Sequence, residues 1–210
     1  MRSLEFIFKV SFLFVIFFIF ISIAPVWADR YGFWVAPFSE YFVWKEYDDH
    51  GKMLLKESGL RGGISLSIED IEEIFNIQLF NYFETVLYGG VVNYDGQTWG
   101  GTPLKSDVSY LGLRVETGLG IYKSYRIIPY LGIGTEAWIR DLTRVPGGYK
   151  ELWDLIFYKL GIKGKVNVLR GDLSLDGWIG SDVITTNRAK FSESFPYSYD
   201  AKTHPDGTLF

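Results

Sequence analysis

The fold is decided by the stretch Asp107-Val-Ser-Tyr-Leu-Gly-Leu-Arg-Val-Glu-Thr-Gly-Leu-Gly-Ile-Tyr122. Its apolar side chains recur at every second residue, with Thr117 as the exception. Side chains alternate across a strand, so a period of two predicts a β-strand with one apolar face, whereas a helix would scatter these leucines. The apolar face holds Leu111, Leu113, Val115, Leu119 and Ile121, and the other face holds Gly112, Arg114, Glu116, Gly118, Gly120 and Tyr122.

The same alternation recurs along the chain and predicts further strands, each longer than the five or six residues of an average strand. Several are long enough to cross a bilayer at a tilt. Glu69 to Ile74 is predicted to be an acidic turn. We therefore expect an all-β protein with an antiparallel up-and-down meander barrel of about eight strands. The predicted strands are 31–47, 52–68, 75–92, 107–122, 126–141, 151–168 and 171–184.

Residues 1–28 have the pattern of a cleaved signal peptide, so we expect the barrel domain to occupy residues 29–184. Val10 to Ala24 is an almost unbroken apolar run, and Pro25 ends it. The run has about 15 residues, fewer than the roughly 20 that a spanning helix needs. We expect cleavage after Ala28, and the alternative is an uncleaved N-terminal anchor. No cysteine lies near this point, which excludes a lipid-anchored lipoprotein.

Composition excludes several classes of partner and site. Removing residues 1–28 takes two of the 21 basic and one of the 25 acidic side chains, which leaves a net charge of −5. With no basic run either, a nucleic-acid partner is not expected. The absence of cysteine removes disulfides, thiolate metal sites and cysteine nucleophiles. All 23 glycines fall after residue 28, which favours a β protein over a helical bundle.

Alternate connections between the predicted strands differ in length and in composition. Those expected on the inner side are short, at 69–74, 123–125 and 169–170. Those expected outside are mostly longer and richer in Gly and Pro, at 48–51, 93–106, 142–150 and beyond 185. Short inner turns and longer outer loops are typical of bacterial outer-membrane barrels.

The polar face of the strands combines glycine, aromatic residues and charges of both signs. In a membrane barrel this face lines the lumen and the apolar face meets lipid, whereas a soluble ligand carrier has the reverse arrangement. We expect the membrane arrangement, with tryptophans and tyrosines near strand ends forming interfacial girdles. The predicted lumen charge network is Arg114, Glu116, Glu136, Arg140, Lys159, Lys163, Asp172 and Asp176. The predicted girdle is Trp99, Tyr110, Tyr122, Tyr125, Trp138, Tyr149, Trp153 and Trp178.

The export signal, the strand Tyr110–Ile121 and the segment Val92–Thr98 resemble small outer-membrane proteins of Gram-negative bacteria. More broadly the chain is similar to the eight-stranded OmpA-like and OmpW-like barrels, up to about residue 184. The resemblance implies a porin-like barrel in the outer membrane, with outer-membrane lipid as its partner.

The tail departs from that family pattern. Such barrels commonly end on an alternating strand with a terminal aromatic; Phe210 is terminal here, but 201–209 does not alternate. We expect 185–210 to be an outer loop or irregular tail that leaves the barrel incomplete at its C-terminus. Truncation of the final strands is the preferred explanation. An irregular meeting of the first and seventh strands, or weak pairing of the tail, is the alternative.

Candidate reactive residues do not converge in the sequence. His50 and His204 fall outside the predicted strands, so a catalytic Ser–His pair at a barrel rim is not supported. Asp48, Asp49 and His50 are adjacent rather than convergent, which argues against a metal site. The glycine pairs lack the lysine and the following helix of a phosphate-binding loop. No catalytic residue, cofactor or metal is expected.

The sequence therefore predicts a non-enzymatic outer-membrane β-barrel, structural or forming a narrow pore, with a polar charged lumen. Two alternatives stay open. One is a soluble periplasmic lipocalin-like barrel that binds an apolar ligand, and the other is an outer-membrane lipid-modifying enzyme.

Overall fold

The computed structural model describes residues 32–48, 50–98, 101–122, 127–168, 171–190 and 201–203. The expected signal peptide, its cleavage site at Ala28 and most of the tail beyond Lys190 lie outside these residues. In the described part of the chain, no helix is long and apolar enough to cross a membrane.

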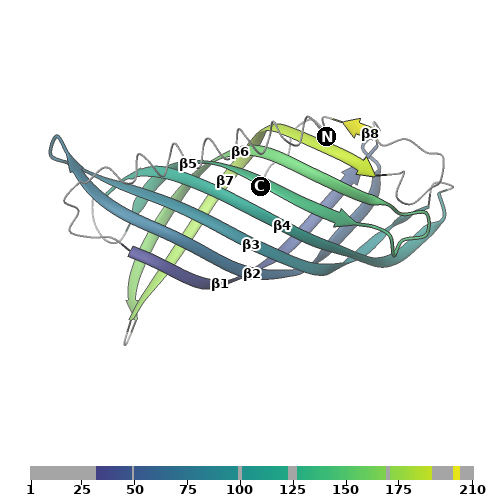
Figure 1. The fold of residues 1–210 in the computed structure, drawn as a ribbon, viewed down its shortest axis with the longest axis horizontal. Coiled ribbons are helices and arrows are strands. Elements are labelled where there is room, and N and C mark those ends of the chain that lie inside the picture. The colour runs from purple at the N-terminus through teal and green to yellow at the C-terminus, as the bar shows by residue number, and fades with distance from the viewer. Residues whose placement is uncertain are drawn as a thin grey trace. The chain divides into compact units, whose positions relative to one another are not determined.

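Seven long strands and one short strand form a single sheet whose strand order follows the chain, each strand antiparallel to the next (Figure 1). This is the up-and-down meander that the sequence predicts. The strands are β1 (Gly32–Tyr47), β2 (Met53–Ile74), β3 (Ile77–Gln97), β4 (Pro103–Ile121), β5 (Ile128–Asp141), β6 (Lys150–Val168), β7 (Gly171–Lys190) and β8 (Ala201–Thr203).

The sheet is not closed into a barrel. Over the described ranges β1 pairs with β2 alone, and β8 pairs with β7 through three residues. The expected barrel is therefore correct in its meander but not in its closure. The sheet is nevertheless strongly curled, since Trp44 on β1 packs edge-on against Trp153 on β6 with ring centroids 5.1 Å apart. Strand twist and coiling produce such curvature.

The acidic segment Glu69 to Ile74 is strand, not turn as predicted. It continues β2, and Ile74 pairs with Ile77 at the start of β3. The turn consists of Phe75 and Asn76, whose φ angles are 52° and 61°. Two residues with positive φ form the tight connection whose twist matches the flanking strands. The pair Phe75-Asn76 lacks the usual Asn-Gly sequence of such a turn, so the sequence does not mark the turn at its actual position. The acidic residues before it suggested a turn at 69–74 instead.

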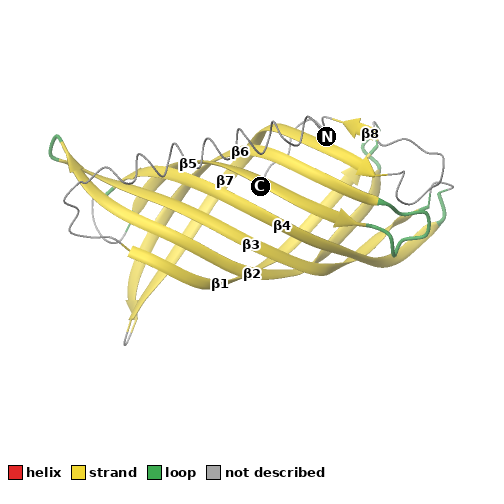
Figure 2. Ribbon diagram, viewed as in Figure 1, coloured by secondary structure: helices red, strands yellow, loops and turns green. Residues whose placement is uncertain are grey.

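The longest predicted connection is also much shorter than expected. β3 continues to Gln97 and β4 begins at Pro103, so the expected loop 93–106 shrinks to residues 98–102. Backbone hydrogen bonds close the loops, from Asp48 N to Lys52 O at 2.9 Å and from Leu142 N to Tyr149 O at 3.0 Å. In a meander the connections β1–β2, β3–β4 and β5–β6 all lie at the same end of the sheet. Figure 2 draws most of the loop segments at that end.

The curled sheet has a concave face, on which the side chains are buried, and a convex face, on which they are exposed. Leu111 on the convex face of β4 is 57% exposed, whereas Tyr110 and Val108 on the concave face are buried. This confirms the orientation that period-two alternation predicts for β4. The concave core is largely aromatic, with Phe80, Tyr82, Tyr88, Tyr110, Tyr122, Tyr130, Trp138, Trp153 and Phe157 among its buried members.

Glycines on the concave face make room for these rings. Gly112 pairs with Tyr88 on the neighbouring strand, and Gly161 pairs with Tyr130. A Cβ at either glycine would overlap the tyrosine ring opposite it. A strand glycine commonly marks such a close approach. This pairing explains why the polar face of the sequence is so rich in both glycine and aromatic residues.

The predicted interfacial girdle is wrong for four of its members. Tyr110, Tyr122, Trp138 and Trp153 are buried on the concave face. On their strands they lie an even number of residues from the glycines of the concave face. Their side chains therefore point to that same face. Tyr149 lies half-buried in the loop 142–149, Trp178 lies half-buried on β7, and Trp99 and Tyr125 fall outside the described residues.

Candidate functional site

The predicted charged residues lie on four consecutive strands. Arg114 and Glu116 are on β4, Glu136 and Arg140 on β5, Lys159 and Lys163 on β6, and Asp176 on β7. The side chain of Asp172, also on β7, is outside the described part of the structure. The others divide into groups along the concave face, together with acidic residues from β1, β2 and β3 that the sequence analysis did not single out.

The first group surrounds Arg140. Its guanidinium contacts three carboxylates, with Nη2 2.6 Å from Glu57 Oε1 and Nη1 2.9 Å from both Glu46 Oε1 and Glu151 Oε2. Only Glu151 lies on the strand that neighbours β5, because Glu46 and Glu57 reach Arg140 from β1 and β2. The curl of the sheet creates this group, and no strand pattern alone predicts it.

Indole and phenol groups fix these carboxylates. Trp153 Nε1 donates to Glu151 Oε2 at 2.8 Å, Trp44 Nε1 donates to Glu46 Oε1 at 2.9 Å, and the Tyr110 hydroxyl donates to Glu57. Charges removed from water require such partners, because a buried ion without hydrogen bonds costs several kcal/mol. The group is a fully engaged network rather than a set of loose charges.

Arg61 on β2 forms a second group that the sequence analysis missed. It pairs with Glu40 on β1 and lies over the ring of Phe42 at 3.9 Å and that of Tyr88 at 4.5 Å. Both strands are less regular in sequence, and β1 is aromatic on both faces. The alternation of Ser65 and Ser67 with apolar residues on β2 is the one feature of the sequence that could have placed Arg61 on the polar face. Arg61 lies on the same face as these two serines.

A central group joins β4, β5 and β6. Glu116 accepts from Lys159, and Arg114 Nε lies 3.8 Å from Glu116 Oε2. Glu136 accepts a hydrogen bond from the Tyr88 hydroxyl. Within the predicted charge network Arg114 therefore lies beside Glu116, whereas Arg140 pairs with carboxylates that the prediction did not include.

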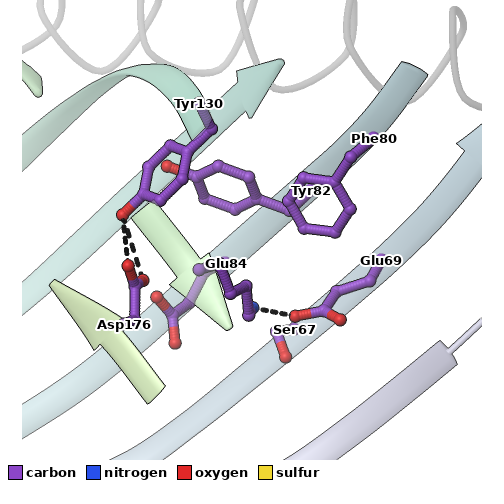
Figure 3. A pocket seen from close by; sticks show the side chains of 8 residues that line it. Ser67, Glu69, Phe80, Tyr82, Glu84, Tyr130 and Asp176 are labelled. Atoms are coloured by element: carbon purple, nitrogen blue, oxygen red, sulfur yellow. Dashed lines mark hydrogen bonds and ion pairs between the residues drawn. The ribbon is translucent and has the colours of Figure 1, made fainter. Parts of the chain in front are cut away.

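A fourth group lines a cavity of about 170 Å³ near the β2–β3 hairpin end of the concave face. Lys163 pairs there with Glu69, and the Tyr130 hydroxyl donates to Asp176 at 2.8 Å. Figure 3 shows the rings of Phe80, Tyr82 and Tyr130 beside these charged groups. The lining residues are Ser67, Glu69, Phe80, Tyr82, Glu84, Tyr130, Lys163 and Asp176.

Between its loop end and its middle, the concave face is filled by side chains. Glu57, Tyr88, Glu116 and Arg140 are all nearly inaccessible to solvent. A wide aqueous channel needs exposed polar side chains along its wall. This arrangement instead gives a packed interior with paired charges, and open space is found at the cavity lined by Lys163 and Asp176.

The described residues show no convergent catalytic set. His50 is in the β1–β2 turn, where its backbone N–H donates to Asp48 Oδ1 at 2.9 Å. His204 is outside the described ranges. Within those ranges, no group of three or more His, Cys, Asp or Glu side chains is placed to hold a metal ion.

Comparisons of the chain with protein-family models, curated proteins and solved structures found no match. They identify no family for this chain, and what the structure shows is an antiparallel meander of seven long strands.

Proposed function

We propose that this chain is a non-enzymatic outer-membrane protein of the β-barrel type, exported by residues 1–28, with lipid on its convex face and a structural, charge-paired interior. One observation carries the proposal: an apolar band covers most of the convex face, and on β3, β4 and β5 its limit toward the longer loops falls within one side-chain step of the same level.

On β4 the band has a sharp limit. Every convex position from Leu111 to Ile121 is apolar except Thr117, whereas Lys105, Asp107 and Ser109 precede it on the same face. An 11-residue strand with the usual rise and a tilt of about 40° spans roughly 25 Å, the height of the apolar band on outer-membrane barrels.

The limit continues onto β3 and β5 within one side-chain step. Asn93 pairs with Asp107, and Ser109 pairs with Asp141. On β3 the band begins one step earlier, because Val91 pairs with Ser109, while Leu111 pairs with Ile139 on β5. Strand pairing thus aligns the polar residues into a line and the apolar residues into a band. Water alone provides no reason for such a line, but a membrane interface does.

The band extends over the seven long strands. Its large exposed side chains adjoin one another across neighbouring strands and form a patch. Such a patch is larger than the single exposed apolar residues that are normal on a soluble protein. They include Phe33, Val35, Tyr41, Leu60, Ile64, Leu66, Ile68, Leu87, Val91, Leu111, Leu113, Leu119, Leu131, Ile133, Ile139, Ile156, Tyr158, Leu160, Ile162, Ile179 and Val183.

The alternatives have less support. A lipocalin-like carrier would turn these apolar side chains toward a greasy cavity, yet the concave face holds Arg140, Lys159 and their carboxylates. A lipid-modifying enzyme of this kind would need a Ser–His pair, and the described residues contain none. Of the two non-enzymatic roles, the filled interior favours a structural protein over an open pore.

Single-cysteine labelling tests the proposal, since the chain has no cysteine of its own. Leu113→Cys and Asp107→Cys lie on the same face of β4, inside and outside the band. With the chain refolded in lipid vesicles, an environment-sensitive label at 113 should be quenched by brominated lipid chains and a label at 107 should not. Equal quenching at both positions would contradict a membrane location.

A further inference from the structure

Two lysines lie opposite each other on the convex side of the β1–β2 hairpin. Lys45 on β1 pairs in register with Lys56 on β2. Their chain neighbours point the other way, because Glu46 contacts Arg140 and Glu57 is buried on the concave face. Side chains opposed in this way have Cβ atoms about 4.5–5.5 Å apart, and like charges at that separation destabilise a sheet.

Neither ammonium group has a counter-ion within the described part of the chain. Asp95 on β3 pairs in register with Lys56, but its carboxylate is engaged by Lys105 on β4, with Nζ 3.6 Å from Oδ2. Lys45 and Lys56 form no ion pair among the described residues. Strand pairing therefore holds two uncompensated positive charges side by side, an arrangement that an anion bridging both ammonium groups would stabilise.

The two lysines lie at the limit of the apolar band toward the longer loops. Val43 precedes Lys45 on the convex face of β1 and is 46% exposed, and Leu60 lies two side-chain steps from Lys56 on β2 and is 66% exposed. A lysine stem lies along apolar surface while its ammonium group reaches the polar side. In a membrane, that level is where the phosphates of lipid headgroups lie.

The convex face of β2 carries the opposite charge at its other end. Ile68 is the last residue of its apolar row, and Asp70 and Glu72 follow on the same face. This face therefore has cations at the limit near the loops and carboxylates at the limit near the β2–β3 turn. An anionic headgroup is attracted to the first limit and repelled from the second.

We propose that Lys45 and Lys56 together bind the phosphate of an anionic lipid headgroup, in the leaflet on the side of the longer loops. Ammonium groups donate charge-assisted hydrogen bonds to phosphate oxygens, and lysine binds phosphate as a point charge. The exposed side chains of Val43 and Leu60 offer the acyl chain an apolar surface that a soluble phosphate ion would leave uncovered. The site rests on the proposed membrane role and names the lipid class that this role would favour.

Lipid-selective quenching tests the site. The full-length chain with Val43→Cys, labelled with an environment-sensitive fluorophore, is refolded in phosphatidylcholine vesicles that contain brominated phosphatidic acid or brominated phosphatidylcholine. A basic residue at a membrane surface favours anionic lipid by about fivefold, so the label should report a preference for phosphatidic acid of at least about fivefold. Lys45→Gln and Lys56→Gln should each lower that preference, and the double variant should abolish it.

Arg144→Gln is the matched control. It removes one positive charge from an exposed position in the loop 142–149, at the same end of the sheet, and should leave the preference unchanged. Both lysine variants relieve a like-charge contact, so their urea midpoints in a neutral detergent should equal or exceed that of the wild type. A lower midpoint in both would mean that the lysines have a structural partner, which would overturn the proposal.

The remaining outcomes separate the site from the membrane role. Equal quenching by the two brominated lipids in the wild type, or a preference that survives in the double variant, would overturn the site and leave the membrane role intact. Loss of the preference on adding inorganic phosphate, but not sodium chloride of equal ionic strength, would assign the lysines to a soluble anion and also overturn it. Quenching by neither lipid would overturn the membrane role and the site together.

Discussion

Arg140 on β5 and Glu57 on β2 form an enclosed ion pair across the concave face, 83 residues apart in the chain. Nη2 lies 2.6 Å from Oε1, and the two side chains are 3% and 0% exposed. The strands between them, β3 and β4, curl around the pair. Because Glu46 and Glu151 also contact Arg140, one guanidinium is the shared cation of three carboxylates.

Arg140→Met should therefore be strongly destabilising. It removes the cation and leaves buried carboxylates unpaired, a change that costs about 3–5 kcal/mol of unfolding free energy. The matched control is Lys105→Met, which breaks the exposed pair with Asp95 and should change stability by less than about 1 kcal/mol. Urea unfolding in detergent, followed by tryptophan fluorescence, measures both. Similar losses would mean that the Arg140 group is hydrated rather than enclosed.

Gly112→Ala tests the pairing of glycines with rings. The new Cβ would overlap the Tyr88 ring, and overpacking of this kind costs about 1–3 kcal/mol. Gly177→Ala on β7 is the control, since a Cβ there meets no atom within 4 Å. That variant should be neutral or slightly stabilising, because alanine restricts the unfolded chain. The same unfolding assay applies, and a Gly112 variant as stable as the Gly177 variant would rule out the steric role.

The β2–β3 turn offers a stabilising change. Phe75 is 94% exposed and has positive φ, so it contributes no burial and adopts a conformation that bulky residues disfavour. Phe75→Asn combined with Asn76→Gly introduces the preferred turn pair and should raise stability by about 0.5–1 kcal/mol. Urea midpoints of the double variant and wild type measure it. A lower midpoint would show that Phe75 makes a stabilising contact, for example with lipid.

How far the sequence predicts this protein depends on which interactions are local. The strand β4 is predictable because alternation between Leu111 and Ile121 is a property of one strand. The inward direction of Glu116, Glu136 and Arg140 follows in the same way. The partners of Arg140 do not, because Glu46 and Glu57 arrive from distant strands through curvature, which no single strand encodes.

Two errors have the same physical origin. Glu69 to Ile74 looked like a turn because of its acidic composition, yet pairing of Ile74 with Ile77 keeps it in β2. Trp138 and Trp153 looked like interfacial residues because of their type, yet their parity directs them inward, where their rings stack with centroids 5.6 Å apart. In both cases strand register outweighs residue preference, since one face of the sheet is buried.

Asp141, at the end of β5 and outside the apolar band, gives a pH-dependent prediction. Partial burial acts to raise its pKa, but hydrogen bonds from Thr143 N at 3.0 Å and Thr143 Oγ1 at 2.6 Å, with Lys150 and Arg144 nearby, lower it below the ordinary 3.8. Because the folded pKa is lower than the unfolded one, the carboxylate stabilises the fold above about pH 4 and this stabilisation is lost as the pH falls through the lowered pKa.

Thr143→Val removes the hydroxyl donor and keeps the N–H, so the pKa of Asp141 should rise part of the way back. Carboxyl ¹³C NMR titration between about pH 2 and pH 6 covers the relevant range. Thr102→Val, in the separate loop 98–102, is the control and should leave that pKa unchanged. An ordinary pKa for Asp141 in the wild type, or no response to Thr143→Val, would refute the role of the hydroxyl.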